Sequence, residues 1–105
     1  MPITIRKPAE GIYKFSVDIS KWPMNPGETV VSSNSRGPLS ATFLTTKRED
    51  VTSDLTEGSP WIVDQTTIGF WLKGGEPGKS YYINLLIPTS DEELLPETIL
   101  LQIVT

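Results

Sequence analysis

The segment 70-FWLKGGEPGKSYYINLLIP-88 places two apolar stretches on either side of a short run rich in glycine. Gly74 and Gly75 allow the positive φ angles that a sharp reversal of the chain needs. Pro77 and Gly78 fit the two central positions of a type II turn, because proline presets φ at the first and glycine accepts a positive φ at the second. The segment therefore predicts a strand, a tight corner and a second strand.

The second strand begins with a tyrosine on its apolar face. Tyr81, Ile83, Leu85 and Ile87 alternate with other residues, so they lie on one side of a strand. In immunoglobulin-like sandwiches, a tyrosine at such a corner hydrogen-bonds through its hydroxyl to nearby backbone. We assign this tyrosine-corner role to Tyr81, because it heads the apolar face directly after the turn.

The same alternation recurs along most of the chain and gives seven or eight expected strands. Turn signals separate them at intervals of about 8–12 residues, and no segment has a convincing helical period. This pattern predicts an all-β fold, an immunoglobulin-like or fibronectin III-like antiparallel β-sandwich, as a single domain over residues 1–105. The expected strands cover residues 2–6, 13–20, 28–33, 39–46, 60–65, 66–73, 80–88 and 98–105.

The first and last strands and two connections carry further signals. Pro2 and Pro8 lack backbone donors, which predicts that the first strand lies at a sheet edge. Residues 47–59 read as irregular, and residues 88–97 read as a long acidic connection. The last strand is apolar on both faces, so either both faces are covered or one of them meets another protein.

The chain contains no cysteine and no histidine. Disulfides, thiolate ligands and a thiol nucleophile are therefore excluded, and the usual general base is missing. The net charge of −4, without a basic stripe, argues against nucleic-acid binding. No apolar run approaches the length of about 18 residues that a membrane helix needs. No secretory signal is visible, so we expect either a cytoplasmic protein or one whose leader has been removed.

Each motif that could indicate a catalytic or ligand-binding site is better interpreted as exposed surface or as a turn. Acidic clusters occur at residues 49–50 and 91–93, but a glycosidase holds its two carboxylates across a cleft, for which so small a sandwich has no room. The second cluster lacks the spacing and the glycine of a calcium loop. Residues 73–80 lack the first glycine of a phosphate-binding loop and precede a strand instead of a helix. We therefore expect no enzymatic activity, no cofactor and no metal.

Tryptophans and a leucine pair are the candidates for partner contacts. Trp71 lies opposite the apolar face of its strand, so it is the tryptophan expected to point outward. The alternatives for its role are core or ordinary packing, contact with a protein partner and stacking on a sugar ring. Trp22 is expected to close one end of the core. Leu94 and Leu95 lie in the acidic connection, where they either contact a partner or fold back over the sandwich edge.

Taken in order, these segments resemble small immunoglobulin-like phage virion proteins of the fibre–tail adaptor type. The matching stretches are KFSVDISKW at residues 14–22, NPGETV at 25–30, FWLKGGEPGKSYYI at 70–83 and TILLQIVT at 98–105. They are strands and turns and carry no site. Residues 47–59 match nothing in the pattern, and TSDEELLPE is longer and more acidic than the hairpin that the pattern has there.

The resemblance implies a non-enzymatic virion protein that joins a tail or neck component to a fibre or a neighbouring virion protein. It implies several copies per particle, assembled in the cytoplasm of the bacterial host, and a free edge of the first or last strand available to a partner's sheet. No catalytic, cofactor-binding or metal-binding residue carries over. A capsid decoration or head-fibre protein bound to the major capsid protein is one alternative, and a carbohydrate-binding or adhesin module is another.

Overall fold

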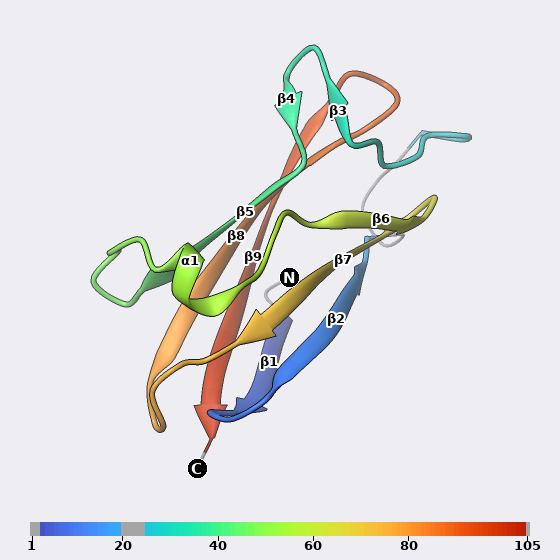
Figure 1. The fold of residues 1–105 in the computed structure, drawn as a ribbon. Helices are drawn as coiled ribbons and strands as arrows, with labels where there is room; N and C mark the ends of the chain where they lie inside the picture. The colour runs from blue at the N-terminus through green and yellow to red at the C-terminus, as the bar shows by residue number, and fades with distance from the viewer. Residues whose placement is uncertain (1–2, 20–24, 105) are drawn as a thin grey trace.

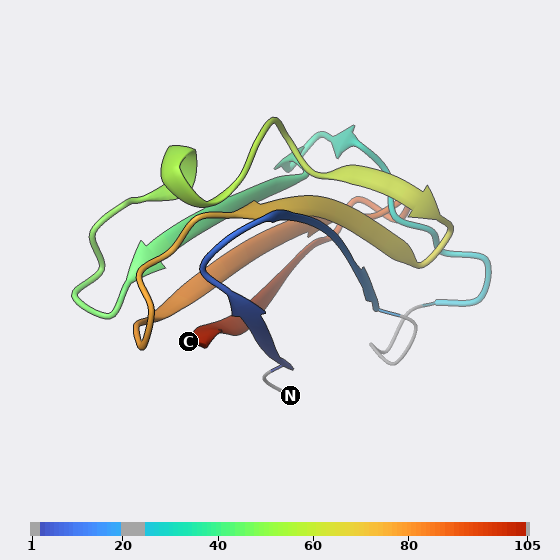
Figure 2. The ribbon, with the colours of Figure 1, turned by 60° about the horizontal axis from the view of Figure 1, so that its bottom comes forward.

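Two β-sheets face each other and enclose the core (Figures 1 and 2). The computed structural model describes residues 3–19 and 25–104. One sheet has the strand order β1 (Ile3–Pro8), β9 (Leu94–Val104), β8 (Ser80–Pro88) and β5 (Ser40–Thr45). The other has the order β2 (Ile12–Asp18), β7 (Thr67–Lys73) and β6 (Trp61–Asp64). The remaining elements of the described residues are a hairpin of β3 (Ser33–Asn34) and β4 (Gly37–Pro38) and the helix α1 (Thr52–Leu55). The predicted all-β sandwich is confirmed.

The strand order is close to that of an immunoglobulin domain. If the seven strands of the two large sheets are lettered A to G along the chain, one sheet is B-E-D and the other is A-G-F-C. In constant-type domains, strand A joins B, E and D instead. Here β1 runs parallel to β9, with Ile5 opposite Leu101, so the sandwich is not antiparallel throughout. The immunoglobulin-like assignment itself stays a prediction.

The apolar faces of the strands meet between the sheets, as their alternation predicts. Ile68, Phe70 and Leu72 of β7 are at most 1% exposed. The ring of Phe43 on β5 stands edge-on to that of Phe70, with centroids 6.3 Å apart, and so links the two sheets. Burying one such side chain stabilises the fold by about 1.5–3 kcal/mol, and a slip of one residue would expose the whole row. These rows therefore fix the register of the central strands.

The corner between β7 and β8 closes as its turn residues predict. The Glu76 carbonyl accepts a hydrogen bond from the Lys79 N–H at 3.0 Å, and Gly78 has φ of +79°, as a type II turn requires. Gly75 has φ of +96°, and a Cβ atom there would lie 2.6 Å from Cδ1 of Ile103. Both the backbone angle and the close approach of β9 therefore require glycine at this position.

Strand β9 is longer than the sequence indicates, so the acidic connection before it is shorter. It begins at Leu94 and pairs with β8 back to Pro88, which leaves only residues 89–93 as a loop. In the sequence, Pro96 favours a loop, because proline has no backbone N–H to donate to the hydrogen bonds between strands. It is tolerated here because β1 pairs only with residues 99–104, so this part of β9 has β8 alone as its neighbour.

Smaller differences concern single segments. Strand β9 lies between β8 and β1 and is no free edge, whereas β1 is an edge as expected. Val30 forms an isolated bridge in place of the strand expected over 28–33. The helical turn α1 occupies part of the region expected to be irregular, because its Leu55 reaches the core. Tyr13 alternates in the sequence with Phe15 and Val17, which predicts that it faces the core, but it is 42% exposed, with the Lys7 ammonium 5.7 Å from its ring centre. In the described part of the chain, no helix is long and apolar enough to cross a membrane.

Candidate partner-contact surfaces

Trp71 lies on the outer face of the three-stranded sheet, beside one other aromatic ring and a cation. Its ring centre is 5.9 Å from that of Trp61, with the ring planes inclined by 52°. Lys14, opposite Trp71 on β2, holds its ammonium 5.4 Å from the Trp71 ring centre. Both tryptophans are half-buried and Lys14 is exposed. We call Lys14, Trp61, Gly69 and Trp71 the tryptophan face.

Gly69 lies directly beneath the Trp61 indole in the tryptophan face. It lies opposite Trp61 in the β6–β7 pair, and a Cβ atom on it would come within 2.7 Å of Cε2 of the Trp61 indole. The indole therefore lies flat on the backbone of β7, which compensates for a glycine inside a strand. Sequence reasoning missed Gly69 and its contact with Trp61, because the only signal is a glycine in mid-strand, and its aromatic neighbour is known only once the strands are paired.

The geometry of the tryptophan face bears on carbohydrate binding. Stacking on sugar rings calls for exposed and roughly coplanar indoles, whereas Trp61 and Trp71 pack on each other at an angle of 52°. Trp22, expected to close the core, lies outside the described residues. The described tryptophans therefore lack the feature that the carbohydrate-binding alternative requires.

Leu94 and Leu95 are not at a loop tip. They are the first two residues of β9, paired with Pro88 and Ile87, and both are half-buried. Leu95 packs against the core cluster. Leu95 thus adopts the placement in which it folds over the sandwich, because β8 continues far enough to pair with it. Leu94 lies on the opposite side of β9, and a partner contact by either leucine stays a prediction.

Tyr81 is buried, and its hydroxyl bonds to the corner that precedes it. The backbone N–H of Glu76 donates to the Tyr81 hydroxyl at 3.1 Å. This is a bond from side chain to backbone five residues upstream, the contact that a tyrosine corner makes. It joins the start of β8 to the type II turn and so stiffens that end of the sandwich.

The opposite end is a polar network between the loop 89–93 and residues 25–36. The Asn34 amide donates to the carbonyls of Thr89 and Glu93, both at 2.9 Å. The carboxylate of Glu92 accepts from the side chain and, at 3.0 Å, from the backbone N–H of Ser35. Hydrogen bonding to Ser35 lowers the pKa of Glu92. The acidic cluster thus stabilises loop structure, and the described residues contain no group of three possible metal ligands.

The two edges of the four-stranded sheet are already protected. On β5, Phe43 accepts from the Val51 N–H at 2.8 Å and donates to the Thr52 hydroxyl at 2.9 Å. On β1, Lys7 points inward and is 3% exposed, donating to the Gly74 and Pro8 carbonyls, each at 2.7 Å. Burial lowers the pKa of Lys7. An inward charge and a covered backbone are both devices against unwanted strand addition.

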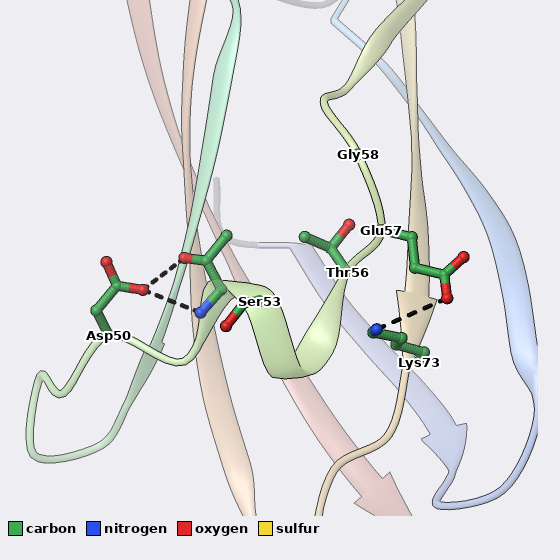
Figure 3. Close-up of a pocket in the computed structure, with 7 residues that line it drawn as sticks. Asp50, Ser53, Thr56, Glu57, Gly58 and Lys73 are labelled. Carbon is green, nitrogen blue, oxygen red and sulfur yellow. Dashed lines mark hydrogen bonds and ion pairs between the residues drawn. The ribbon is translucent and has the colours of Figure 1, made fainter.

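A shallow hollow beside α1 is another place where polar groups gather (Figure 3). Asp50 accepts hydrogen bonds from the N–H and hydroxyl of Thr52, at 2.9 and 2.7 Å, and these bonds lower the pKa of its carboxyl. Lys73 faces Glu57 at 3.6 Å. Asp50 and Thr52 therefore position α1 against β5, and the Glu57–Lys73 pair joins the segment after α1 to β7.

Comparison with known protein families identifies a match. The model of the podophage GP4 fiber-tail adaptor protein gp77 family matches residues 7–102. The chain belongs to this family. No curated protein matches the chain.

Membership in the fiber-tail adaptor family confirms the resemblance seen in the sequence. The match runs from β1 to β9 and so spans the whole sandwich. It makes the protein a phage structural adaptor and a virion component. The surfaces of this fiber-tail adaptor, more than any cleft, are accordingly the places to look for function.

Proposed function

We propose that this protein joins a tail or neck component of the virion to a fibre or a neighbouring virion protein, and that the tryptophan face is one of its docking surfaces. The proposal rests on family membership and is carried by one observation: the Lys14 ammonium lies over Trp71, and Lys14 has no ion pair with a carboxylate in the described part of the chain. The particle would be assembled in the cytoplasm of the bacterial host.

The tryptophan face has the chemistry of a protein contact. Tryptophan and tyrosine dominate interface energetics because they supply large apolar area at a small loss of rotamer entropy. Trp61 is held in place by Gly69 and Trp71, so little further ordering is needed when a partner binds. The partner that fits best has an apolar residue for the indoles and a carboxylate for Lys14.

The test is binding of the purified chain to the tail and fibre proteins of the same phage. Lys14→Glu reverses the charge of an exposed residue, so we expect binding to at least one partner to weaken by about 10-fold or more. Trp71→Ala should weaken it further, with folding checked by circular dichroism. Lys47→Glu is the matched control, since Lys47 is an exposed lysine in the loop after β5.

The outcomes separate the proposal from its alternatives. Equal binding by all three variants would rule out the tryptophan face as a docking surface. Binding to assembled capsid shells, with no binding to tail or fibre proteins, would favour the capsid decoration alternative instead.

A further inference from the structure

The outer face of the four-stranded sheet is almost free of charge. The buried residues of each strand and the strand register fix which side chains point outward. Three of these are large and well exposed: Tyr82 at 40%, Leu86 at 41% and Val104 at 40%. We call the outward set the uncharged face: Thr4, Arg6, Pro8, Ser40, Thr42, Leu44, Ser80, Tyr82, Asn84, Leu86, Pro96, Thr98, Leu100, Gln102 and Val104.

Arg6 is the one charged side chain of the uncharged face. It lies on the edge strand β1 and donates to the Gln102 side chain at 3.2 Å. The four strands place none of the 13 acidic residues of the chain on this face, and Asp50, which forms an isolated bridge with Leu44 of β5, lies at its edge. By contrast, the outward positions of β2 and β7 include Lys14, Asp18 and Lys73. Depletion of charge marks the centres of protein interfaces, and those of homodimers are the most apolar.

We propose that the uncharged face is a contact between two copies of this chain. A second copy carries the same net charge of −4, so two copies repel each other least where both faces lack acidic groups. The polar groups of this face are hydroxyls and amides, each of which can both donate and accept. In a two-fold contact the same surface meets itself, and a group near the axis meets its own copy, which hydroxyls and amides allow and two carboxylates or two ammonium groups do not. This inference goes beyond the proposed function and does not depend on it.

The area of the uncharged face determines how tightly the dimer is expected to associate. Strands lie about 4.8 Å apart and rise about 3.3 Å per residue, so four strands of roughly eight residues present on the order of 500 Å². Two copies would then bury about 1,000 Å² in total, at the lower end of specific interfaces. We therefore expect a weak dimer that forms as concentration rises and that high local concentration in a particle would favour.

The dimer has a defined consequence for the rest of the molecule. Sheets that pack face to face lie about 10 Å apart with strands inclined by about 30°. Because the uncharged face and the tryptophan face are on different sheets, pairing through the first leaves both copies of the second exposed on opposite sides (Figure 2). One dimer could thus hold two partner molecules.

Sedimentation equilibrium of the full chain, from about 1 µM to about 1 mM, measures the proposed association directly. The wild type should pass from monomer to dimer mass over this range. Tyr82→Lys and Leu86→Lys each put a charge into the centre of the contact, and each should weaken the dimer by about 10-fold or more. Val63→Lys is the matched control, because Val63 is 52% exposed on β6 of the other sheet.

Three results would overturn the inference. The first is a wild type that stays monomeric at every concentration. The second is a dimer that Tyr82→Lys and Leu86→Lys leave intact, or that Val63→Lys disrupts equally, with all variants shown to be folded. The third is a wild type that stays monomeric and binds a tail or fibre protein, with this binding lost in Tyr82→Lys. That result would assign the uncharged face to the tail or fibre protein and would leave the adaptor function unaffected.

Discussion

The Tyr81 hydroxyl is a single polar atom that joins β8 to the corner before it. Replacing Tyr81 with phenylalanine keeps the buried ring and removes the acceptor of the Glu76 N–H. Because one hydrogen bond contributes a net stabilisation of about 0.5–1.5 kcal/mol, we expect the free energy of unfolding to fall by about 1 kcal/mol. Urea unfolding of Tyr81→Phe measures this. Tyr82→Phe, on the outward and 40% exposed neighbour, should change it by less than about 0.5 kcal/mol.

Glu92 gives the folded protein a dependence on pH. Hydrogen bonds from Ser35, together with the charge of Arg36, lower the pKa of Glu92 below its ordinary value of 4.5. The folded state thus favours the carboxylate. Its contribution to stability is complete above pH 4.5 and is lost as the pH falls through the lowered pKa.

Glu92→Gln should therefore be less stable than the wild type at pH 7, and the difference should shrink on acidification. Thermal unfolding from pH 7 to pH 2.5 tests this expectation, with Glu10→Gln as the exposed control. A difference between Glu92→Gln and wild type that stays constant over this range would contradict the assigned role of the carboxylate.

At the scale of elements, residues 49–52 take the place of a neighbouring strand along β5. The Thr52 hydroxyl accepts from the Phe43 N–H at 2.9 Å and donates to Asp50 at 2.7 Å. Thr52→Val has nearly the same shape but leaves the Phe43 N–H unpaired, so we expect a loss of about 1–2 kcal/mol in urea unfolding. Thr46→Val, in the exposed loop after β5, is the control. Equal stability of the two variants would mean that the edge does not depend on this bond.

The strands that sequence alone located are those whose alternation is strong and local. Ile68, Phe70 and Leu72 give the inward face of β7, and the Pro77-Gly78 pair gives the turn after it, because both signals lie within a few residues. The start of β9 was not predictable in the same way. Whether Pro96 can lie in a strand depends on how far β1 extends along β9, and that pairing joins residues nearly a whole chain apart.

The candidate surfaces also differ in how much of them the sequence alone predicts. The outward position of Trp71 follows from the alternation of its own strand. Its packing against Trp61 depends on Gly69, which becomes significant only when β6 and β7 are paired. Part of the uncharged face was predictable, since the sequence of β9 is apolar on both sides. That none of its four strands contributes an acidic side chain depends on the order of the strands, and Asp50 lies only at its edge, in the bridge to Leu44.

At the scale of the whole molecule, the two sheets present outer faces of different chemistry. One combines aromatic rings with a cation, and the other combines apolar side chains with hydroxyls and amides. Buried rows between the sheets and hydrogen-bonded networks at both ends hold these faces in fixed relation. A rigid body with two distinct surfaces is what joining other proteins requires, and it agrees with membership in a fiber-tail adaptor family.

If this protein connects fibres to the tail, as we propose, particles made without it should lack fibres. The most direct measurement is electron microscopy of particles made by phage that carry a stop codon early in its gene, with the protein supplied from a plasmid as the control. We expect filled heads with tails that lack fibres, and restored fibres in the complemented particles. Particles with a normal set of fibres in the absence of the protein would contradict it.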